Sequence, residues 1–509
     1  MTLKITLGDL LHECAAKFAD RPFVAMAETG KTVSYGAFET LTNRLAHGMQ
    51  DRFGSGLGYA AIVLENSIEY LALTYALKKI NVVEVSVNRA MCGAPLARMI
   101  DQTEAPVLFT SGAHLEALYQ VRNDITHLRI LVMMDATDQA RRMFPELEVI
   151  PFEELLAERS DHIISSAKDT DTATILFTSG TTGVSKGCML SHRYAVRTAE
   201  NMIGPFRIAS EDCVYAPYPL SHIGAAYYDI LPTMMTGGRV IMRDRFSLSN
   251  FWREVNEHGV TWYMMLGSVQ QLLWANPPSD LEKSHKITRC WSTPAPVPKA
   301  DFDTRFNTHL IPGGGYGSTD AGWVVVPQWD HKGGKVLPHF EVEIQDDDGE
   351  RLPAGKAGHV AVRPKEPGVM ASGYFGMPER TLESRRNLWF QTGDFGRMDE
   401  DGLFYFMHRV SERIRVKGEM VSGYEVEEGI LTHPAVEDCA VIAVPGEMGE
   451  EDIKAFVTIK DGQSINAGTL RQYCAGRMAK FMIPKHFVFI DVMPRTPTGK
   501  PEKGKLAAL

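Results

Sequence analysis

The stretch at residues 177–187, FTSGTTGVSKG, constrains the fold more than any other part of the chain. It combines hydroxyl side chains, glycines and one lysine. Glycine allows a positive φ and a close approach to a ligand, so successive backbone N–H groups can point at one anion. A strand-like run at residues 173–177 comes before it, and Ser191 after it is the expected N-cap of a helix reaching residue 203. The local prediction is a strand, a phosphate-binding loop and a helix.

The loop is not a Walker A sequence, because G-x-x-x-x-G-K-[ST] occurs nowhere in the chain. Composition alone leaves an ordinary surface turn as an equal alternative. The order T-S-G-T-T-G-x-x-K-G, however, resembles the phosphate loop of the adenylate-forming enzymes. That superfamily contains acyl-CoA synthetases, peptide-synthetase adenylation domains and luciferases. The resemblance implies ATP phosphate contacts from Thr178, Ser179, Gly180, Thr181, Thr182, Gly183 and Lys186, with Thr182 also catalytic and a ligand of Mg²⁺.

The overall composition is that of an ordinary globular protein of several domains. The chain has 509 residues, which exceeds the size of one core, and 44% of them are hydrophobic. A net charge of −10 argues against nucleic acid as a partner. Seven scattered cysteines show no metal-ligand spacing and are expected to be reduced. With no signal peptide and no apolar run of membrane-spanning length, we expect a cytoplasmic protein.

Alternating helical and strand patterns predict an α/β fold. Helices are expected at residues 35–49 and 69–79, and buried strands at 60–64, 82–87 and 107–110. Repeated units of this kind form doubly wound parallel sheets, which bind ligands beyond the carboxyl ends of their strands. The predicted N-terminal domain covers residues 1–410. Its two α/β subdomains cover about 1–170 and 171–334.

His222 lies in the stretch YAPYPLSHIG. A lone histidine in an apolar neighbourhood is more often a hydrogen-bonded core residue than a catalytic one. The resemblance instead implies that His222 positions the acyl carboxylate, in a substrate pocket that also includes Tyr227, Gly267 and Gly314. Relatives that activate amino acids hold the substrate amine with an aspartate near this point, but Asp229 is too far along the chain to match it.

The second informative stretch is GGGYGSTD at residues 313–320, where glycines and Tyr316 can accommodate a planar base. Taken alone, a glycine turn beside an edge strand is an equal alternative. The stretch resembles the family's Y-G-x-T-E, with Asp320 replacing glutamate as the expected Mg²⁺ ligand. The resemblance implies ATP contacts from Gly315, Tyr316, Gly317, Ser318 and Thr319.

Short alternating segments at residues 335–409 predict a small antiparallel β-barrel. Within it, WFQTGD resembles the family's W-x-x-T-G-D, which makes Asp394 the expected anchor of the ribose diol. Arg409 is expected to reinforce it by hydrogen bonding to ribose or phosphate.

Residues 411–509 are predicted to form a small, mobile α+β lid. Ser411 stands where the family keeps a hinge residue, and Lys417, Gly418 and Glu419 resemble a turn lining the thiol tunnel. Near the end of the chain, PRTPTGK resembles the motif whose lysine, here Lys500, serves adenylation. On its own, Lys500 would read as a solvated lysine near a terminus.

The resemblance covers essentially the whole chain and is strongest to bacterial CoA ligases of the betaine/carnitine type. It implies a ligase that uses ATP, Mg²⁺ and coenzyme A to convert a small carboxylic acid into its thioester through an acyl adenylate, with the lid rotating between the half-reactions. Two alternatives stay open: an adenylase that loads a carrier protein, and an inactive nucleotide-binding regulator. A homodimer is compatible with either enzyme.

Overall fold

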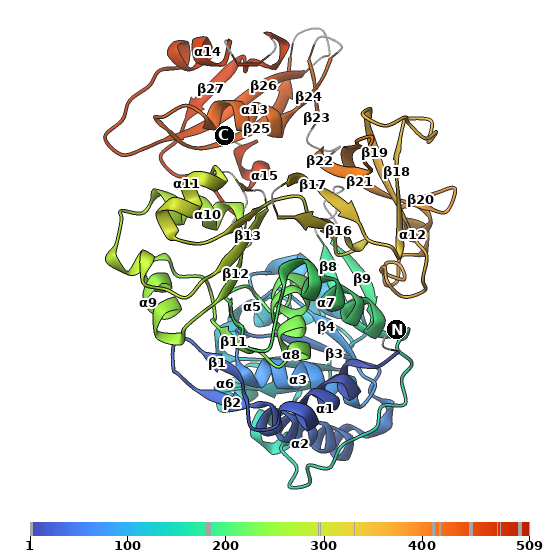
Figure 1. The fold of residues 1–509 in the computed structure, drawn as a ribbon. Helices are drawn as coiled ribbons and strands as arrows, with labels where there is room; N and C mark the ends of the chain where they lie inside the picture. Colours follow the sequence, from blue (N-terminus) through green and yellow to red (C-terminus); the bar gives the residue numbers. More distant parts are fainter. Residues whose placement is uncertain are drawn as a thin grey trace.

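The structure is a computed structural model with two parallel sheets, one antiparallel sheet and a separate C-terminal unit (Figure 1). It describes residues 4–178, 185–293, 295, 297–329, 331–409, 413–416, 419–446, 451–475, 477–478, 480–496, 501–507 and 509. The predicted α/β class is confirmed, because parallel sheets with flanking helices form the large part of the molecule.

The first parallel sheet carries the predicted phosphate loop at its edge. Its strands are β3 (Tyr59–Val63), β4 (Val83–Ser86), β5 (Val107–Thr110), β6 (Ile130–Met133), β7 (Glu148–Pro151), β8 (Thr172–Thr178) and β9 (Lys186–Ser191). Their order is β7, β6, β5, β3, β4, β8, β9, and only β8 and β9 pair antiparallel.

The hairpin of β8 and β9 corrects the expected succession of strand, loop and helix. A second strand intervenes, because Cys188 and Leu190 alternate along it and are fully buried. Only then does the helix α7 (His192–Phe206) begin, and its N-cap is the predicted Ser191, whose Oγ accepts a hydrogen bond from the Tyr194 N–H at 3.0 Å.

The second parallel sheet contains strands from both of the predicted subdomains. Its strands are β1 (Pro22–Met26), β2 (Thr32–Ser34), β10 (Cys213–Ala216), β11 (Arg239–Met242), β12 (Trp262–Leu266), β13 (Arg289–Thr293) and β14 (Leu310–Pro312), in the order β14, β13, β12, β10, β11, β1, β2. β1 lies parallel to β11, whereas β8 and β9 complete the first sheet. Strands from both sides of residue 170 therefore enter both sheets, and the two subdomains are interlocked.

Helices cover these sheets, and none of the described helices is long and apolar enough to cross a membrane. The α-helices are α1 (Leu7–Phe18), α2 (Tyr35–Phe53), α3 (Ile68–Lys79), α4 (Gly93–Asp101), α5 (Leu115–Gln120), α6 (Thr137–Met143), α7, α8 (Leu231–Thr236), α9 (Leu248–His258), α10 (Gly267–Ala275) and α11 (Lys299–Phe306). The short helices are η1 (Gly54–Gly56), η2 (Gly112–His114), η3 (Arg122–Asp124), η4 (Phe152–Leu155) and η6 (Asp280–Lys283), together with the π-helix η5 (Gly224–Ile230).

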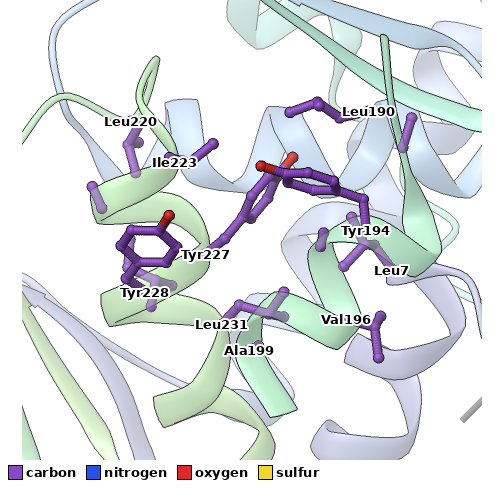
Figure 2. Close-up of a cluster of buried hydrophobic side chains, with 14 of the residues drawn as sticks. Leu7, Leu190, Tyr194, Val196, Ala199, Leu220, Ile223, Tyr227, Tyr228 and Leu231 are labelled. Atoms are coloured by element: carbon purple, nitrogen blue, oxygen red, sulfur yellow. The ribbon is translucent and has the colours of Figure 1, made fainter. Parts of the chain in front are cut away.

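In the main hydrophobic core, helix α7 packs against the π-helix η5, which follows His222 in the chain. Figure 2 shows Tyr194 of α7 beside Tyr227 of η5, with Leu7 and Leu190 around them. The two tyrosine rings meet edge to face with centroids 6.2 Å apart, an arrangement worth about 0.5–1.5 kcal/mol beyond area burial. This packing holds η5 against the strand hairpin of the predicted phosphate loop.

The antiparallel sheet begins earlier than residue 335. Its strands are β15 (Tyr316–Ser318), β16 (Gly322–Gln328), β17 (His331–Val336), β18 (Phe340–Gln345), β19 (Ala357–Pro364), β20 (Arg385–Arg386), β21 (Trp389–Met398) and β22 (Leu403–Arg409), with the helix α12 (Pro378–Glu383) between β19 and β20. The order is β15, β16, β17, β22, β21, β19, β18, with β20 on β21. Among the described residues this pairing is an open path, so the closed barrel stays a prediction.

The C-terminal unit has its own hydrophobic core, which includes Ile414, Val426, Ile430 and Val457. Its elements are β23 (Arg413–Val416), β24 (Glu419–Ser422), α13 (Gly423–Leu431), β25 (Val436–Pro445), β26 (Glu451–Ile459), α14 (Ala467–Ala475), η9 (Lys480–Met482), β27 (His486–Phe489) and α15 (Lys503–Leu506). The mixture of helices and two small sheets confirms the predicted α+β character of this unit. Its boundary at residue 411 stays a prediction.

Candidate active site

Several predicted site residues lie outside the described residues, and their roles stay predictions. They are Ser179, Gly180, Thr181, Thr182, Gly183, Ser411, Lys417, Gly418 and Lys500. The structure describes both ends of the phosphate loop. Thr178 and Lys186 face each other as a pair at the end of the β8–β9 hairpin from which the phosphate loop extends. The hairpin therefore brings the first hydroxyl and the lysine of the motif to one place.

Lys186 and the predicted metal ligand Asp320 meet at one side chain that the sequence prediction did not include. The Lys186 Nζ lies 4.7 Å from the centroid of the Tyr374 ring. The Tyr374 hydroxyl donates a 2.6 Å hydrogen bond to Oδ1 of Asp320. Burial, followed by the neighbouring Asp320 carboxylate, raises the pKa of Tyr374, so the phenol stays protonated as a donor.

The same carboxylate oxygen has a second donor. The Sγ of Cys188 lies 3.5 Å from Asp320 Oδ1, and burial and the Asp320 charge raise the pKa of this thiol well above its usual value. Asp320 as a residue is partly exposed. Within the described part of the chain, no group donates to its other carboxylate oxygen, Oδ2. A carboxylate with one oxygen fixed and the other without a donor among the described residues fits the hard, oxygen-only coordination of Mg²⁺.

A second group gathers the residues predicted to hold adenosine. The Tyr316 hydroxyl donates a 2.7 Å hydrogen bond to Oδ2 of Asp394, and the Arg409 Nε lies 3.4 Å from Oδ1. Asp394 and Arg409 are direct partners in the pairing of β21 with β22. Burial, then the Asp394 charge, raises the pKa of Tyr316 well above its usual value. Asp394 is thus held between a neutral donor and a cation.

The ring of Tyr316 is 7% exposed and already has aromatic neighbours. The Phe404 ring is tilted against the Tyr316 ring, with their centroids 4.9 Å apart. The Phe406 ring is stacked on it, with a centroid distance of 6.0 Å and an interplanar angle of 22°. Phe406 is 46% exposed, although it was not predicted as a site residue.

His222 is exposed and lies two residues before the start of the π-helix η5. Its Nδ1 accepts a 3.0 Å hydrogen bond from the Gly224 N–H. Acceptance at Nδ1 leaves the proton of a neutral imidazole on Nε2, where it can be donated outward. π-Helices are rare and are found mostly at functional sites. This geometry fits the predicted role in positioning a carboxylate.

Tyr227 and Tyr228 point in different directions (Figure 2). The Tyr227 hydroxyl lies inside the protein and donates to Thr174 Oγ1 at 3.1 Å. Tyr228 lies with Trp323 on the other side, at a centroid distance of 5.0 Å, and Trp291 lies 5.3 Å from Trp323. These three residues, absent from the sequence prediction, are each at most 8% exposed and form an aromatic cluster, called here the aromatic wall.

The aromatic wall of Tyr228, Trp291 and Trp323 lies against the predicted glycine turn. A Cβ at Gly315 would stand 2.7 Å from Trp323 and 2.9 Å from Trp291, so no larger residue fits without displacing a ring. Gly314 has a φ of +72°, which favours glycine for a different reason. Gly267 begins the helix α10 and is buried.

Asp229 is fully buried in η5. Neither carboxylate oxygen has a hydrogen-bond partner among the described residues. Burial alone raises its pKa well above the ordinary value, because the ionised form would be unsolvated. Burial therefore favours the neutral form of this side chain, which is unlike the charged aspartate that holds the substrate amine in the amino-acid-activating relatives.

A cluster far from these residues contains His12, Glu39 and His162, whose ligand atoms lie within 4.8 Å of one another. The two imidazole rings are stacked at 3.7 Å with an interplanar angle of 13°. Lone pairs in two parallel ring planes cannot converge on one ion. Lys79 also donates to both oxygens of Glu39 at 3.0 Å, so the carboxylate is already neutralised.

Comparison with known proteins gives matches over the whole chain. The family described as "AMP-binding enzyme" matches residues 11–375, and "AMP-binding enzyme C-terminal domain" matches residues 425–500. The chain is 29% identical to the crotonobetaine/carnitine–CoA ligase of Proteus mirabilis, over 87% of this chain and 86% of the relative. It is 27% identical to the sulfoacetate–CoA ligase of Cupriavidus necator, over 98% of this chain and 97% of that relative.

Among solved structures, the anthranilate CoA ligase AuaEII in complex with anthranoyl-AMP superposes with a TM-score of 0.87 at 19% identity. The match covers 100% of this chain and 98% of that structure. At this identity the similarity establishes the fold.

Proposed function

This chain belongs to the AMP-binding enzyme family, and from that membership we propose that it is an ATP-dependent carboxylate–CoA ligase. In the first half-reaction, a carboxylate oxygen attacks the α-phosphorus of ATP, which yields an acyl adenylate and releases pyrophosphate. In the second, the thiol of coenzyme A attacks the acyl carbonyl, which yields the thioester and releases AMP. The observation that carries the proposal is the family match at residues 11–375, which spans the phosphate-loop hairpin, Asp320 and His222.

The chain's own groups would act mainly by position and charge, as phosphoryl-transfer chemistry requires. Asp394 would accept hydrogen bonds from the ribose hydroxyls while Tyr316 and Arg409 hold its carboxylate in place. Lys186 and the hydroxyls of the phosphate loop would surround the triphosphate. Asp320, with Thr182, would hold Mg²⁺, which when bound neutralises charge on the phosphates.

Lys500 would neutralise the approach of the anionic carboxylate to the anionic phosphate during adenylation. We propose that the C-terminal unit then turns about Ser411, so that Lys500 leaves and Lys417, Gly418 and Glu419 approach coenzyme A. Because of this rotation, Lys500 would act in adenylate formation and not in thioester formation.

The acid is proposed from the residues near Gly315. The relatives named above differ in their acids, since one is named for crotonobetaine or carnitine and another for sulfoacetate. The aromatic wall of Tyr228, Trp291 and Trp323 favours an apolar or cationic acyl group, because aromatic faces pack against apolar groups and attract cations. We therefore propose a medium-sized aliphatic, cyclic or carnitine-like acid, oriented by His222.

The test is pyrophosphate release by the purified protein with MgATP and a panel of carboxylic acids, with and without coenzyme A. Release accompanied by one class of acyl-CoA supports the ligase and identifies its substrate. Adenylate without thioester would favour the loader of a carrier protein, which a holo-carrier assay would then test. ATP binding without turnover over the whole panel would favour a regulator and contradict the proposal.

A further inference from the structure

Residues 371–375 tie the strand after the phosphate loop to the loop of Asp320. This segment, called here the strap, runs antiparallel beside β9, with Cys188 opposite Tyr374. Its backbone hydrogen bonds are Ser372 N–H to Met189 O (2.9 Å), Met189 N–H to Gly373 O (3.0 Å), Phe375 N–H to Gly187 O (2.8 Å) and Ala371 N–H to Asp320 O (3.0 Å). The strap is therefore fixed to both halves of the predicted triphosphate site.

Tyr374 is the strap residue whose side chain contacts both halves. Its backbone N–H donates to Thr381 Oγ1 at 2.9 Å, and the residue is only 7% exposed, so the phenol has little freedom to move. The ring carries the Lys186 ammonium over its face at 4.7 Å, and the hydroxyl reaches Asp320 Oδ1 at 2.6 Å. One rigid side chain thus sets the separation between the lysine and the carboxylate.

The two contacts use different parts of the phenol. A cation over an aromatic face is attracted by the ring itself and does not need the hydroxyl. The hydrogen bond needs only the hydroxyl, and it occupies one oxygen of a short carboxylate. With Oδ1 engaged by Tyr374 and Cys188, the carboxylate of Asp320 is held in one orientation, and no described group donates to its Oδ2.

We propose that Tyr374 is a positioning residue for the metal: its hydroxyl orients Asp320 toward the Mg²⁺ of MgATP, while its ring positions Lys186 for the triphosphate. This inference rests on the proposed function, because it assumes that ATP binds between Lys186 and Asp320. It assigns to Tyr374 an effect on metal affinity that is separate from any effect on acid binding.

The decisive variant is Tyr374→Phe, which keeps the ring and removes the hydroxyl. We measure Mn²⁺ binding to the protein–ATP complex by electron paramagnetic resonance of free Mn²⁺, and the Mg²⁺ dependence of pyrophosphate release. Loss of one hydrogen bond to a charged group predicts a half-saturating metal concentration about tenfold higher. Affinity for metal-free ATP and the KM for the acid should stay within about twofold, because the Lys186 contact and His222 are unchanged.

The matched control is Tyr70→Phe. Tyr70 is 1% exposed and its hydroxyl lies 2.8 Å from Ser86 Oγ, so this variant also loses one buried hydroxyl contact, but one that involves neither Lys186 nor Asp320. A second variant, Tyr374→Leu, removes the ring as well and should additionally weaken binding of metal-free ATP. Thermal unfolding of each variant shows that it is folded.

Unchanged Mn²⁺ affinity in folded Tyr374→Phe would overturn the inference, as would an equal loss in Tyr70→Phe. The same would follow if the wild type bound no Mn²⁺ with ATP. If the wild type binds Mn²⁺ and ATP but no acid yields pyrophosphate, the proposed function fails. In that case the metal-binding comparison still decides the role of Tyr374.

Discussion

The hydroxyl of Tyr316 donates a 2.7 Å hydrogen bond to Asp394, although the two residues lie on strands four steps apart in the antiparallel sheet. In a flat sheet, strands four steps apart would be separated by about 19 Å. The sheet must therefore curl strongly, which brings the edge strand β15 over β21. The curl gathers an aromatic ring, a carboxylate and, through β22, the Arg409 guanidinium into one site.

Asp394→Ala should weaken ATP binding without changing the preference among acids. Removal of a carboxylate that accepts ribose hydroxyls predicts a KM for ATP higher by roughly 10- to 100-fold. Pyrophosphate release at varied ATP, measured with two competing acids, tests this. Asp401→Ala is the control, because Asp401 is exposed on the turn between the same strands. A selective change in acid preference would contradict the ribose assignment.

Lys500→Ala should slow adenylate formation by roughly 10²- to 10³-fold, since a charge that offsets transition-state repulsion is lost. Thioester formation from supplied acyl adenylate should remain within a few-fold of the wild-type rate. Single-turnover assays of each half-reaction measure the two effects separately. The control is Lys505→Ala, an exposed lysine of the same terminal segment that pairs with Glu502. Equal loss in both half-reactions would argue against a rotating lid.

His222→Ala should raise the KM for the carboxylic acid by about tenfold, because a hydrogen-bond donor to the carboxylate is removed. The KM for ATP should be nearly unchanged. Initial rates at varied acid and fixed MgATP measure the effect, with the exposed and distant His127→Ala as the control. A KM for ATP that rises as much as that for the acid would place His222 outside the acyl pocket.

Asp229→Asn should change how stability depends on pH. The folded-state pKa of Asp229 is raised, so between the unfolded-state value near 4 and the folded-state value the native protein holds one proton more than the unfolded chain. As the pH rises across that window, the free energy of unfolding of the wild type, relative to that of Asp229→Asn, should therefore fall by about 1.4 kcal/mol per pH unit. At pH 4 and below the difference should no longer change with pH.

Denaturant unfolding of both proteins from pH 4 to pH 8 measures this difference. Asp20→Asn, at an exposed position, should show no such pH-dependent difference from the wild type. A constant difference between wild type and Asp229→Asn at all pH values would mean that Asp229 is ionised and solvated in the folded state.

The local elements followed closely from the residues. The strand β5 begins and ends at its predicted residues, and the helices α2 and α3 begin at or one residue before their predicted starts. Hydrophobic periodicity and capping residues are local properties, so a window of the sequence is enough to recognise them. The strand β9 was missed because a short hairpin after a glycine-rich loop has no such long pattern.

Pairing between distant segments did not follow in this way. The placement of β1 beside β11, the strap beside β9 and the curl that joins Tyr316 to Asp394 depend on contacts between residues far apart in the chain. The aromatic wall and Tyr374 have ordinary sequence surroundings. They belong to the candidate site only because folding brings them against Gly315 and Asp320.

The sequence by itself determined the α/β class, the family resemblance and the chemical types of the groups that would meet ATP, because these are written in local patterns and ordered motifs. The tertiary structure alone decided which oxygen of Asp320 is engaged, which side of the Tyr316 ring is covered and that burial raises the pKa of Asp229. Those properties depend on distance and on exclusion of water, and both arise only when the sheets and helices have packed.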